Sequence, residues 1–253
     1  MVREQYSIME VSIITPTYHR RPFIPALIQI YLQQTYPKEK MEWIILDDGR
    51  DKVEDLFKEV SIPNLRYIHH PEKMRIGEKR NRLNKEAKVA IIIAMDDDDN
   101  YPVERVQSVV DAFRKHPTIQ LAGSSEMYMY YIDTKKIYSI GPHGQHHATN
   151  GTMAWRKKYS DTHRYDEFVT KAEEVSFLEN YVNPMIQLDP KSTILVICHT
   201  DNTVDKSKLR EEHEKAHNHP HKMKEIAYHL EDIVIDPYLR EFYHTLPALL
   251  NSL

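Results

Sequence analysis

Residues 91–102 read IIIAMDDDDNYP, an apolar run that ends in four consecutive aspartates. Adjacent carboxylates repel one another, and aspartate is a poor former of both helices and strands. The aspartates directly follow the apolar segment VAIIIAM, so they lie at the end of an expected buried strand. This position favours a site for a divalent cation, with a solvated acidic loop as the alternative.

Segments with the character of buried strands alternate with amphipathic segments up to the aspartate run. The expected strands are residues 11–18, 41–49, 65–70 and 89–95, and the expected helices are residues 22–37, 52–60 and 77–88. This alternation predicts an α/β fold, a single Rossmann-like domain with a mostly parallel central sheet flanked by helices. Ligands of such sheets bind beyond the carboxyl ends of the strands, where Asp47, Asp48 and residues 96–99 are expected.

The pattern after residue 101 is mixed. We expect a helix at 103–116, a hairpin from 119–133 and 136–142, a loop and strand at 144–159, a helix at 171–182 and a late strand at 192–200. Residues 205–253 are charged and rich in histidine and then become amphipathic, which predicts a C-terminal helical extension of a domain over residues 1–204.

Composition excludes several classes of function. The net charge of −4 gives no basic footprint for nucleic acid or for an anionic membrane surface. No apolar stretch is long enough for a signal peptide or a membrane span, so we expect a soluble, cytoplasmic protein. The single cysteine, Cys198, excludes an internal disulfide and fits a reducing compartment. No Walker or Rossmann glycine pattern follows an expected strand.

Several blocks, in this order and spacing, resemble family 2 nucleotide-sugar glycosyltransferases with the GT-A fold. The blocks are VSIITPTYHR, QQTYP, WIILDDG, GEKRNRLN and MDDDDNYPVERV. Further on, GTMAWRKKY and AEEVSFLENY resemble the acceptor-side strand and the acidic catalytic helix of that family. The resemblance covers about residues 11–204. It implies a nucleotide-binding half (1–100), an acceptor-binding half (101–204) and a metal-dependent, inverting transfer of a sugar to a hydroxyl of a glycan or other acceptor.

The resemblance implies a nucleotide site in the first half. The turn Pro16, Thr17 and Tyr18 is expected to touch the base, and Asp48 is expected to hydrogen-bond it. Uridine diphosphate is the expected nucleotide, with GDP and dTDP left open. The candidates near the nucleotide on the following basic helix are Arg75, Lys79 and Arg80, for which a solvated basic face is the alternative.

The same resemblance implies a Mn²⁺ or Mg²⁺ cofactor at an Asp-x-Asp motif formed by Asp96 and Asp98. Asp98 is the expected direct ligand, and Asp96 is expected to contact the ribose or the metal. The family usually has a small residue where this chain has Asp97, which we expect near the ribose or a backbone amide. His199 follows an apolar strand and is a candidate ligand of the cation or diphosphate, with a structural histidine as the alternative.

Sugar transfer with inversion needs a base for the acceptor proton. Glu174 matches the position of the family's base, which is usually aspartate, and Glu173 is expected to face the acceptor or the donor sugar. Two solvated glutamates on a helix are the alternative. Trp155 is either a core residue or a stacking platform for a sugar ring. The loop with His143, His146 and His147 precedes the acceptor strand and is expected to border the sugar.

Two other functions are weighed against transfer. A nucleotidyltransferase shares the layout and the acidic site, but it would normally have a glycine-rich loop where this chain has TPTYHRRP. A non-catalytic carbohydrate- or cation-binding module would need the acidic ligands but no base. His213 and His217 have helical spacing for Zn²⁺, but no further ligand completes a site, so we expect the C-terminal histidines in a solvated segment.

Overall fold

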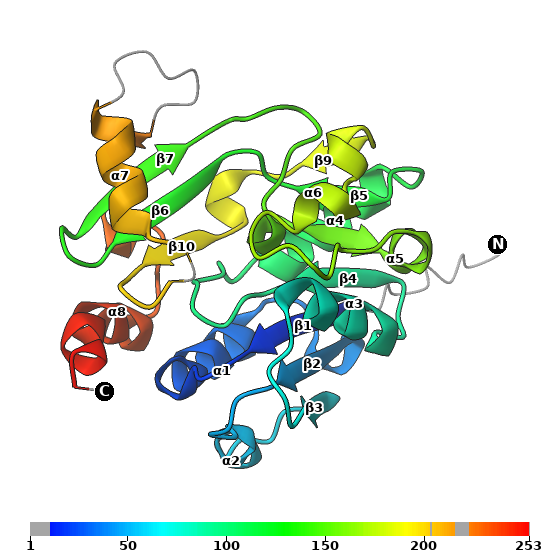
Figure 1. Ribbon diagram of the computed structural model, residues 1–253, viewed down its shortest axis with the longest axis horizontal. Helices are drawn as coiled ribbons and strands as arrows, with labels where there is room; N and C mark the ends of the chain where they lie inside the picture. Colours follow the sequence, from blue (N-terminus) through cyan, green and yellow to red (C-terminus); the bar gives the residue numbers. More distant parts are fainter. Residues whose placement is uncertain (1–10, 203, 216–222, 253) are drawn as a thin grey trace, which may run out of the picture.

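A seven-stranded sheet forms the centre of the molecule (Figure 1). The computed structural model describes residues 11–202, 204–215 and 223–252. Across the sheet the order is β3 (Leu65–His69), β2 (Met41–Asp47), β1 (Val11–Thr17), β4 (Ile91–Ala94), β8 (Ala154–Arg156), β5 (Leu121–Gly123) and β9 (Met185–Gln187). The first four strands are parallel, and β8 is antiparallel to both of its neighbours. The predicted α/β class and the mostly parallel sheet are confirmed.

The sheet separates two layers of hydrophobic core. Every residue of β1 is buried, as expected for a central strand covered on both faces. Side chains of a strand alternate between the faces, so Ile13 belongs to one cluster and its neighbour Ile14 to the other. One layer is covered by α1 (Ile24–Gln33), α2 (Glu54–Lys58) and α4 (Arg105–Lys115), and the other by α3 (Ile76–Glu86), α5 (Lys157–Thr162) and α6 (Glu174–Phe177).

A second, four-stranded sheet lies beside the first (Figure 1). Its order is β10 (Leu195–Cys198), β6 (Met127–Tyr131), β7 (Lys136–Ile140) and β11 (Lys224–Glu225). The hairpin expected around residue 134 is confirmed, because β6 and β7 pair in antiparallel register. The first strand of the hairpin, expected over residues 119–133, is shorter than expected. Residues 121–123 form the separate strand β5, which pairs with β8 and β9 in the main sheet.

The C-terminal residues pack on the rest of the chain. They form α7 (Lys206–Lys215), β11 and α8 (Pro237–Leu250). Asp236 caps α8 and also accepts hydrogen bonds from the amides of Gln29 and Gln33, so α8 lies against α1 (Figure 1). Short 3₁₀ turns complete the fold: η1 (Arg21–Phe23), η2 (Lys38–Lys40), η3 (Asn150–Thr152), η4 (Glu179–Tyr181), η5 (Pro190–Ser192) and η6 (Leu230–Asp232). Among the described residues, no helix has both the length and the apolar character needed to cross a bilayer.

The single helix expected at 171–182 is wrong. Ala172 has a left-handed φ of 54°, α6 has only four residues, and the next three residues after Leu178 are again left-handed. Phe177 and Leu178 are both buried against the second core layer, and the turn after them leads the chain into β9. Tertiary packing therefore overrides the local helical pattern.

Candidate active site

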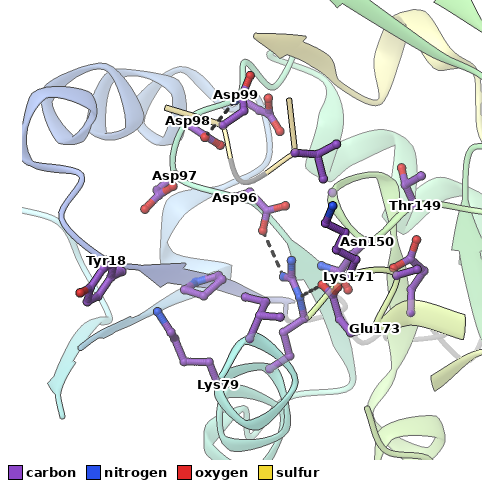
Figure 2. Close-up of a pocket in the computed structure, with 18 of the residues that line it drawn as sticks. Tyr18, Lys79, Asp96, Asp97, Asp98, Asp99, Thr149, Asn150, Lys171 and Glu173 are labelled. Atoms are coloured by element: carbon purple, nitrogen blue, oxygen red, sulfur yellow. Dashed lines mark hydrogen bonds and ion pairs between the residues drawn. The ribbon is translucent and has the colours of Figure 1, made fainter. Parts of the chain in front are cut away.

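A pocket of about 710 Å³ opens at the carboxyl ends of β1 and β4 (Figure 2). One wall carries the end of β1, the start of α3 and the aspartate run. The opposite wall carries residues 149–151 and 169–174. Residues from both halves of the chain thus meet at the edge of the sheet where an α/β fold binds its ligands.

The turn after β1 forms the first part of the pocket. Pro16, Thr17 and Tyr18 all line it, and the Nζ atom of Lys73 lies 4.4 Å from the centre of the Tyr18 ring. Tyr18 is only partly buried, which favours a surface for stacking over a core role.

Asp48 and Lys79 form a buried ion pair next to this turn. The Lys79 Nζ atom lies 2.5 Å from Asp48 Oδ1 and also donates to the carbonyl of Thr17. The amide of Met74 donates to the other oxygen of Asp48. Lys79 and Arg80 are 5% and 6% exposed, so the solvated-face alternative is wrong for both; Arg75 is exposed at the pocket rim. Whether Asp48 contacts a base stays a prediction.

Arg80 joins the two walls of the pocket. Its Nη1 atom lies 3.1 Å from Asp96 Oδ1, and its Nε atom donates to Glu173 Oε1 at 2.8 Å (Figure 2). Burial alone would lower the pKa of this guanidinium, but the charges of Asp96 and Glu173 raise it. Glu173 is only 8% exposed, and its carboxylate is bound to Arg80. The alternative of a solvated glutamate is therefore wrong for this residue.

Asp98 meets a different set of partners from Asp96. Strand β4 ends at Ala94, so strict alternation does not continue through the aspartates. Asp98 Oδ2 lies 3.3 Å from His199 Nε2 and 3.3 Å from Arg20 Nη2, and Arg20 also approaches Asp97 at 3.7 Å. The expectation that Asp96 and Asp98 share one ion assumed that side chains keep alternating as in a strand, but the strand ends before the aspartates. The role of Asp96 as a ligand stays a prediction.

The aspartate run is tolerated because each carboxylate has a partner. The fourth aspartate, Asp99, accepts a hydrogen bond from the backbone amide of Ile197 at 2.9 Å. Burial raises the pKa of Asp97 to about 7, helped by the charge of Asp98, and burial raises the pKa of Asp99 well above its usual range. Burial would also raise the pKa of Asp98, but the hydrogen bond with His199 and the charge of Arg20 lower it. Of Asp97, Asp98 and Asp99, only Asp98 has its pKa lowered by its surroundings.

The donor chemistry at Asp98 and His199 fits a hard divalent cation. Adjacent ligands of an octahedral ion with bonds of about 2.1 Å lie about 3 Å apart, close to the separation of these two side-chain atoms. The amide of Asp201 donates to Nδ1 of His199, so Nε2 carries the ring proton and faces Asp98, with Asn202 Nδ2 2.9 Å away. A cation at Nε2 would require loss of this proton and of the hydrogen bond to Nδ1. Within the described ranges, no three His, Cys, Asp or Glu side chains gather to hold an ion, so water and a ligand's phosphates would complete the shell.

Glu174 lines the pocket on the wall formed by residues 149–151 and 169–174, which we call the acceptor wall after the role expected for it. Burial raises its pKa above the ordinary value, and the neighbouring charge of Glu173 raises it further. A carboxylate with a raised pKa holds a proton more readily, as a general base must during the reaction. Because Glu174 is half-buried, the alternative of a fully solvated glutamate is wrong.

Trp155 is a core residue. Its side chain is fully buried, packs against Phe177 and donates a hydrogen bond from Nε1 to Asn84 Oδ1. The proposal that it stacks on a sugar is wrong, because the antiparallel pairing of β8 with β4 and β5 places the ring inside the second core layer. His213 is also buried, against the expectation of a solvated segment; His217, His219 and His221 lie outside the described residues.

The sequence analysis missed several pocket residues. Arg20 follows the strand-end turn by two positions and could have been found from that position alone. Asn150, Gly151 and Lys206 had no such signal, because long-range packing brings them to the pocket.

The comparisons with known proteins agree with this architecture. The sequence model of glycosyl transferase family 2 matches residues 12–167. An uncharacterised glycosyltransferase of Haemophilus influenzae is 29% identical over 109 residues, which are 43% of this chain and 36% of that protein. The chain thus spans about a third of the length of this curated relative.

Two solved structures have the same fold. S. aureus TarS 1-349 in complex with UDP-GlcNAc matches with a TM-score of 0.64 and 17% identity, over 83% of this chain and 68% of that one. A mannosyltransferase from Pyrobaculum calidifontis in complex with GDP-Man and Mn²⁺ matches with a TM-score of 0.61 and 13% identity, over 96% of this chain and 70% of that one. With the family match extending over more than half of its residues, the chain belongs to glycosyl transferase family 2.

Proposed function

We propose that the protein transfers a sugar from a nucleoside-diphosphate sugar to a hydroxyl group of an acceptor, with inversion at the anomeric carbon. The observation that carries this proposal is the arrangement of one pocket: Asp98, whose carboxylate pairs with the buried His199 behind it, lies on one wall, and the half-buried Glu174 with a raised pKa lies on the other. In an inverting transfer, the groups that stabilise the leaving diphosphate and the base that accepts the acceptor proton must lie on opposite sides of the reacting carbon.

The donor occupies the wall formed by residues from the first half of the chain. Its base lies at the turn of Pro16, Thr17 and Tyr18, with Arg75 at the rim. Asp48 is fully buried and supports this turn through Lys79, which also donates to the carbonyl of Thr17; a hydrogen bond from the base to Asp48 would require its carboxylate to be uncovered. Asp96 and Asp97 lie on the path to the ribose and the diphosphate. We propose UDP as the nucleotide, in agreement with the complexes of TarS; the mannosyltransferase complex contains GDP-Man, so the base is a point for experiment.

The transfer is a single displacement. The acceptor oxygen bonds to the anomeric carbon as the bond from that carbon to the diphosphate oxygen breaks, and the electron pair leaves with the nucleoside diphosphate. The acceptor proton passes to the carboxylate of Glu174. Glu173, held by Arg80, orients the donor sugar or the acceptor.

Asp98 would hold Mn²⁺ or Mg²⁺, with Asp96 as a candidate ligand nearby and His199 as a further ligand once its Nε2 proton is lost. Bound there, the cation would offset the charge of the diphosphate as a Lewis acid. Arg20 and Lys206 also line this end of the pocket and would contact the phosphates. Residues 1–204 would supply the two halves of the site. Residues 205–253 would add Lys206 to the pocket and α8, which packs against α1.

Thermal unfolding tests the donor class. Wild type and Asp98→Ala are melted with UDP, GDP and dTDP, each with Mn²⁺, Mg²⁺ or EDTA; Asp111→Ala on the exposed face of α4 is the control. One nucleotide at about 100 times its dissociation constant should raise the melting temperature by about 5–10 °C in a metal-dependent way, and Asp98→Ala should lose this shift. No shift with any nucleotide in the folded wild type would overturn the proposal.

A further inference from the structure

A positive charge of the chain itself lies against the aspartate run. The Nη2 atom of Arg20 is 3.3 Å from Asp98 Oδ2, and its Nε atom is 3.7 Å from Asp97 Oδ1. Arg20 lines the pocket together with both aspartates, and its side chain is only 15% exposed. An arginine therefore neutralises the carboxylates at which a divalent cation is expected.

Arg20 is held in this position by contacts other than the ion pairs. Its Nη2 atom donates to the carbonyl of Asp201 at 2.7 Å, and its guanidinium carbon lies 5.4 Å from the centre of the Phe23 ring. The amide of the same Asp201 donates to Nδ1 of His199. The segment that follows β10 thus fixes both Arg20 and His199 around one carboxylate, so this arrangement is built into the fold.

One oxygen of Asp98 is surrounded by three donors. Oδ2 lies 3.3 Å from Arg20 Nη2, 3.3 Å from His199 Nε2 and 3.4 Å from Asn202 Nδ2. A carboxylate oxygen offers about two lone-pair sites. The three donors therefore leave no free lone pair on this oxygen, and a cation can bind there only when one of the donors leaves.

Arg20 is the donor that a cation would displace. The side chain of His199 is fully buried, and Asn202 is uncharged, whereas Arg20 carries a full positive charge and borders the pocket. A cation on either oxygen of Asp98 would lie within a few ångströms of the guanidinium, and like charges at such a distance repel one another. Arg20 and a divalent cation therefore compete for Asp98.

A diphosphate offers Arg20 a second position. The planar guanidinium matches the geometry of phosphate oxygens and can bind two of them with parallel hydrogen bonds. Arg20 borders the end of the pocket that carries Asp98, where the diphosphate is proposed to lie. Phosphate oxygens can thus bind the guanidinium when a cation replaces it at the carboxylate.

We propose that Arg20 is the counter-charge of the nucleotide-free pocket: it competes with a divalent cation for Asp98 and moves to the diphosphate when a nucleotide enters. This inference rests on the proposed function, which supplies the diphosphate. A nucleotide then favours the cation by removing Arg20 from Asp98, in addition to any direct contact between the two ligands. By linkage, the cation favours the nucleotide by the same factor.

The first experiment measures Mn²⁺ binding to the full chain without nucleotide, from the electron paramagnetic resonance signal of free Mn²⁺. Arg20→Met removes the charge and the donors, so the dissociation constant of Mn²⁺ should fall about tenfold. The double variant Arg20→Met/Asp98→Ala should lose this gain, which would locate the added affinity at Asp98. A dissociation constant in Arg20→Met that equals or exceeds that of wild type would overturn the inference.

Arg21→Met is the matched control. Arg21 is the next residue in the chain and also pairs with two aspartates, Asp51 at 2.7 Å and Asp55 at 2.9 Å, but it lies outside the set of residues that line the pocket. Its replacement should leave the Mn²⁺ affinity within about twofold of wild type, because exposed charges outside the site are screened. An equal gain in both variants would show a general effect of net charge and overturn the role of Arg20.

The second experiment tests the movement to the diphosphate. UDP, or whichever of GDP and dTDP binds, is titrated calorimetrically into wild type and Arg20→Met, with Mn²⁺ and with EDTA. The factor by which Mn²⁺ tightens nucleotide binding should be about tenfold smaller in Arg20→Met. Nucleotide binding in EDTA should also weaken by about threefold or more, because the guanidinium no longer contacts the phosphates. An unchanged factor would overturn the inference.

The outcomes distinguish the two proposals. A wild type that binds a nucleotide with Mn²⁺, together with an Arg20→Met variant whose Mn²⁺ affinity is not improved, overturns the role of Arg20 and leaves the transfer function standing. A folded wild type that binds no nucleotide under any condition overturns the proposed function, and the movement of Arg20 to a diphosphate falls with it.

Discussion

The donor wall and the acceptor wall of the pocket are built in different ways. The wall formed by the end of β1, the start of α3 and the aspartate run, here called the donor wall, is carried by the ends of β1 and β4, which are parallel neighbours buried on both faces. The acceptor wall is carried by a four-residue helix, left-handed turns and the loop between β7 and β8. One wall follows regular structure, and the other depends on irregular backbone held by packing.

This difference agrees with what each wall has to recognise. A nucleoside diphosphate is common to many donors, and strand ends present charged groups to it from a rigid sheet. Acceptors differ between enzymes that share a fold, and irregular segments can change without disturbing the sheet. We therefore expect substitutions on the two walls to have separable effects on donor binding and on transfer.

Glu174→Gln should have the largest effect. The amide cannot take the acceptor proton, so transfer should fall by about 10²–10⁴-fold while UDP binding in the presence of Mn²⁺ stays close to wild type. Initial-rate measurements of transfer and thermal shifts with UDP check the two parts. Glu179→Gln, on the exposed turn, is the control. Full activity of Glu174→Gln would remove this residue as the base, and retained binding of a carbohydrate without any turnover in wild type would favour a non-catalytic module.

Arg80→Met tests the side chain that pairs with both Asp96 and Glu173 and so links the two walls. Its removal leaves Asp96 and Glu173 without their shared cation in a buried position, so the free energy of unfolding should fall by about 3–5 kcal/mol. Urea unfolding followed by circular dichroism measures the loss. Arg82→Met, on the partly exposed face of the same helix, should change stability by less than about 0.5 kcal/mol. Equal losses in both variants would contradict a linking role for Arg80.

Phe23→Leu tests how the C-terminal helix supports the donor wall. The Phe23 ring lies 4.8 Å from the ring of His199 and 6.2 Å from that of Phe242 on α8, so it connects α8 to the proposed cation ligand. We expect the affinity for Mn²⁺, measured by calorimetric titration with UDP present, to weaken by about tenfold.

The matched control is Phe57→Leu, which alters another buried phenylalanine of the same core cluster away from the pocket. Both variants should lose about 1 kcal/mol of stability, but only Phe23→Leu should weaken the cation site. Similar Mn²⁺ affinities in the two variants would show that the contact with His199 has no effect on the ligand.

The pH dependence of transfer should show the smallest effect. Glu174 must be ionised to act as a base, so kcat/KM falls as the pH drops through its pKa. Because burial raises that pKa above 4.5, the fall should begin at a higher pH than for an exposed glutamate. Glu174→Asp should move the acid limb down by about 0.4 unit, the difference between the ordinary values of the two residues. An acid limb that does not move would assign the titration to another group.

Much of the donor wall could be predicted from sequence because its signals are local. A β-branched run followed by a polar turn identifies a strand end, and the α/β topology brings such ends together. The aspartate run was located in this way, whereas the site roles of Tyr18 and Lys79 were expected from the family resemblance. The burial of Lys79 and Arg80 was not predictable, because their helix reads as basic and solvated until the partners Asp48, Asp96 and Glu173 are placed around it.

The sequence by itself determined the α/β class, a mostly parallel sheet from alternating buried runs, and the position of the aspartates at a strand end. Only the tertiary structure decided that Asp96 pairs with Arg80 while Asp98 meets His199, that Trp155 lies in the core, and that residues 171–182 break into left-handed turns. The physical reason is the range of the interactions. Strand and helix periodicity is encoded within a few neighbouring residues. The pairs Arg80–Glu173 and Asp98–His199, in contrast, join residues about a hundred positions apart.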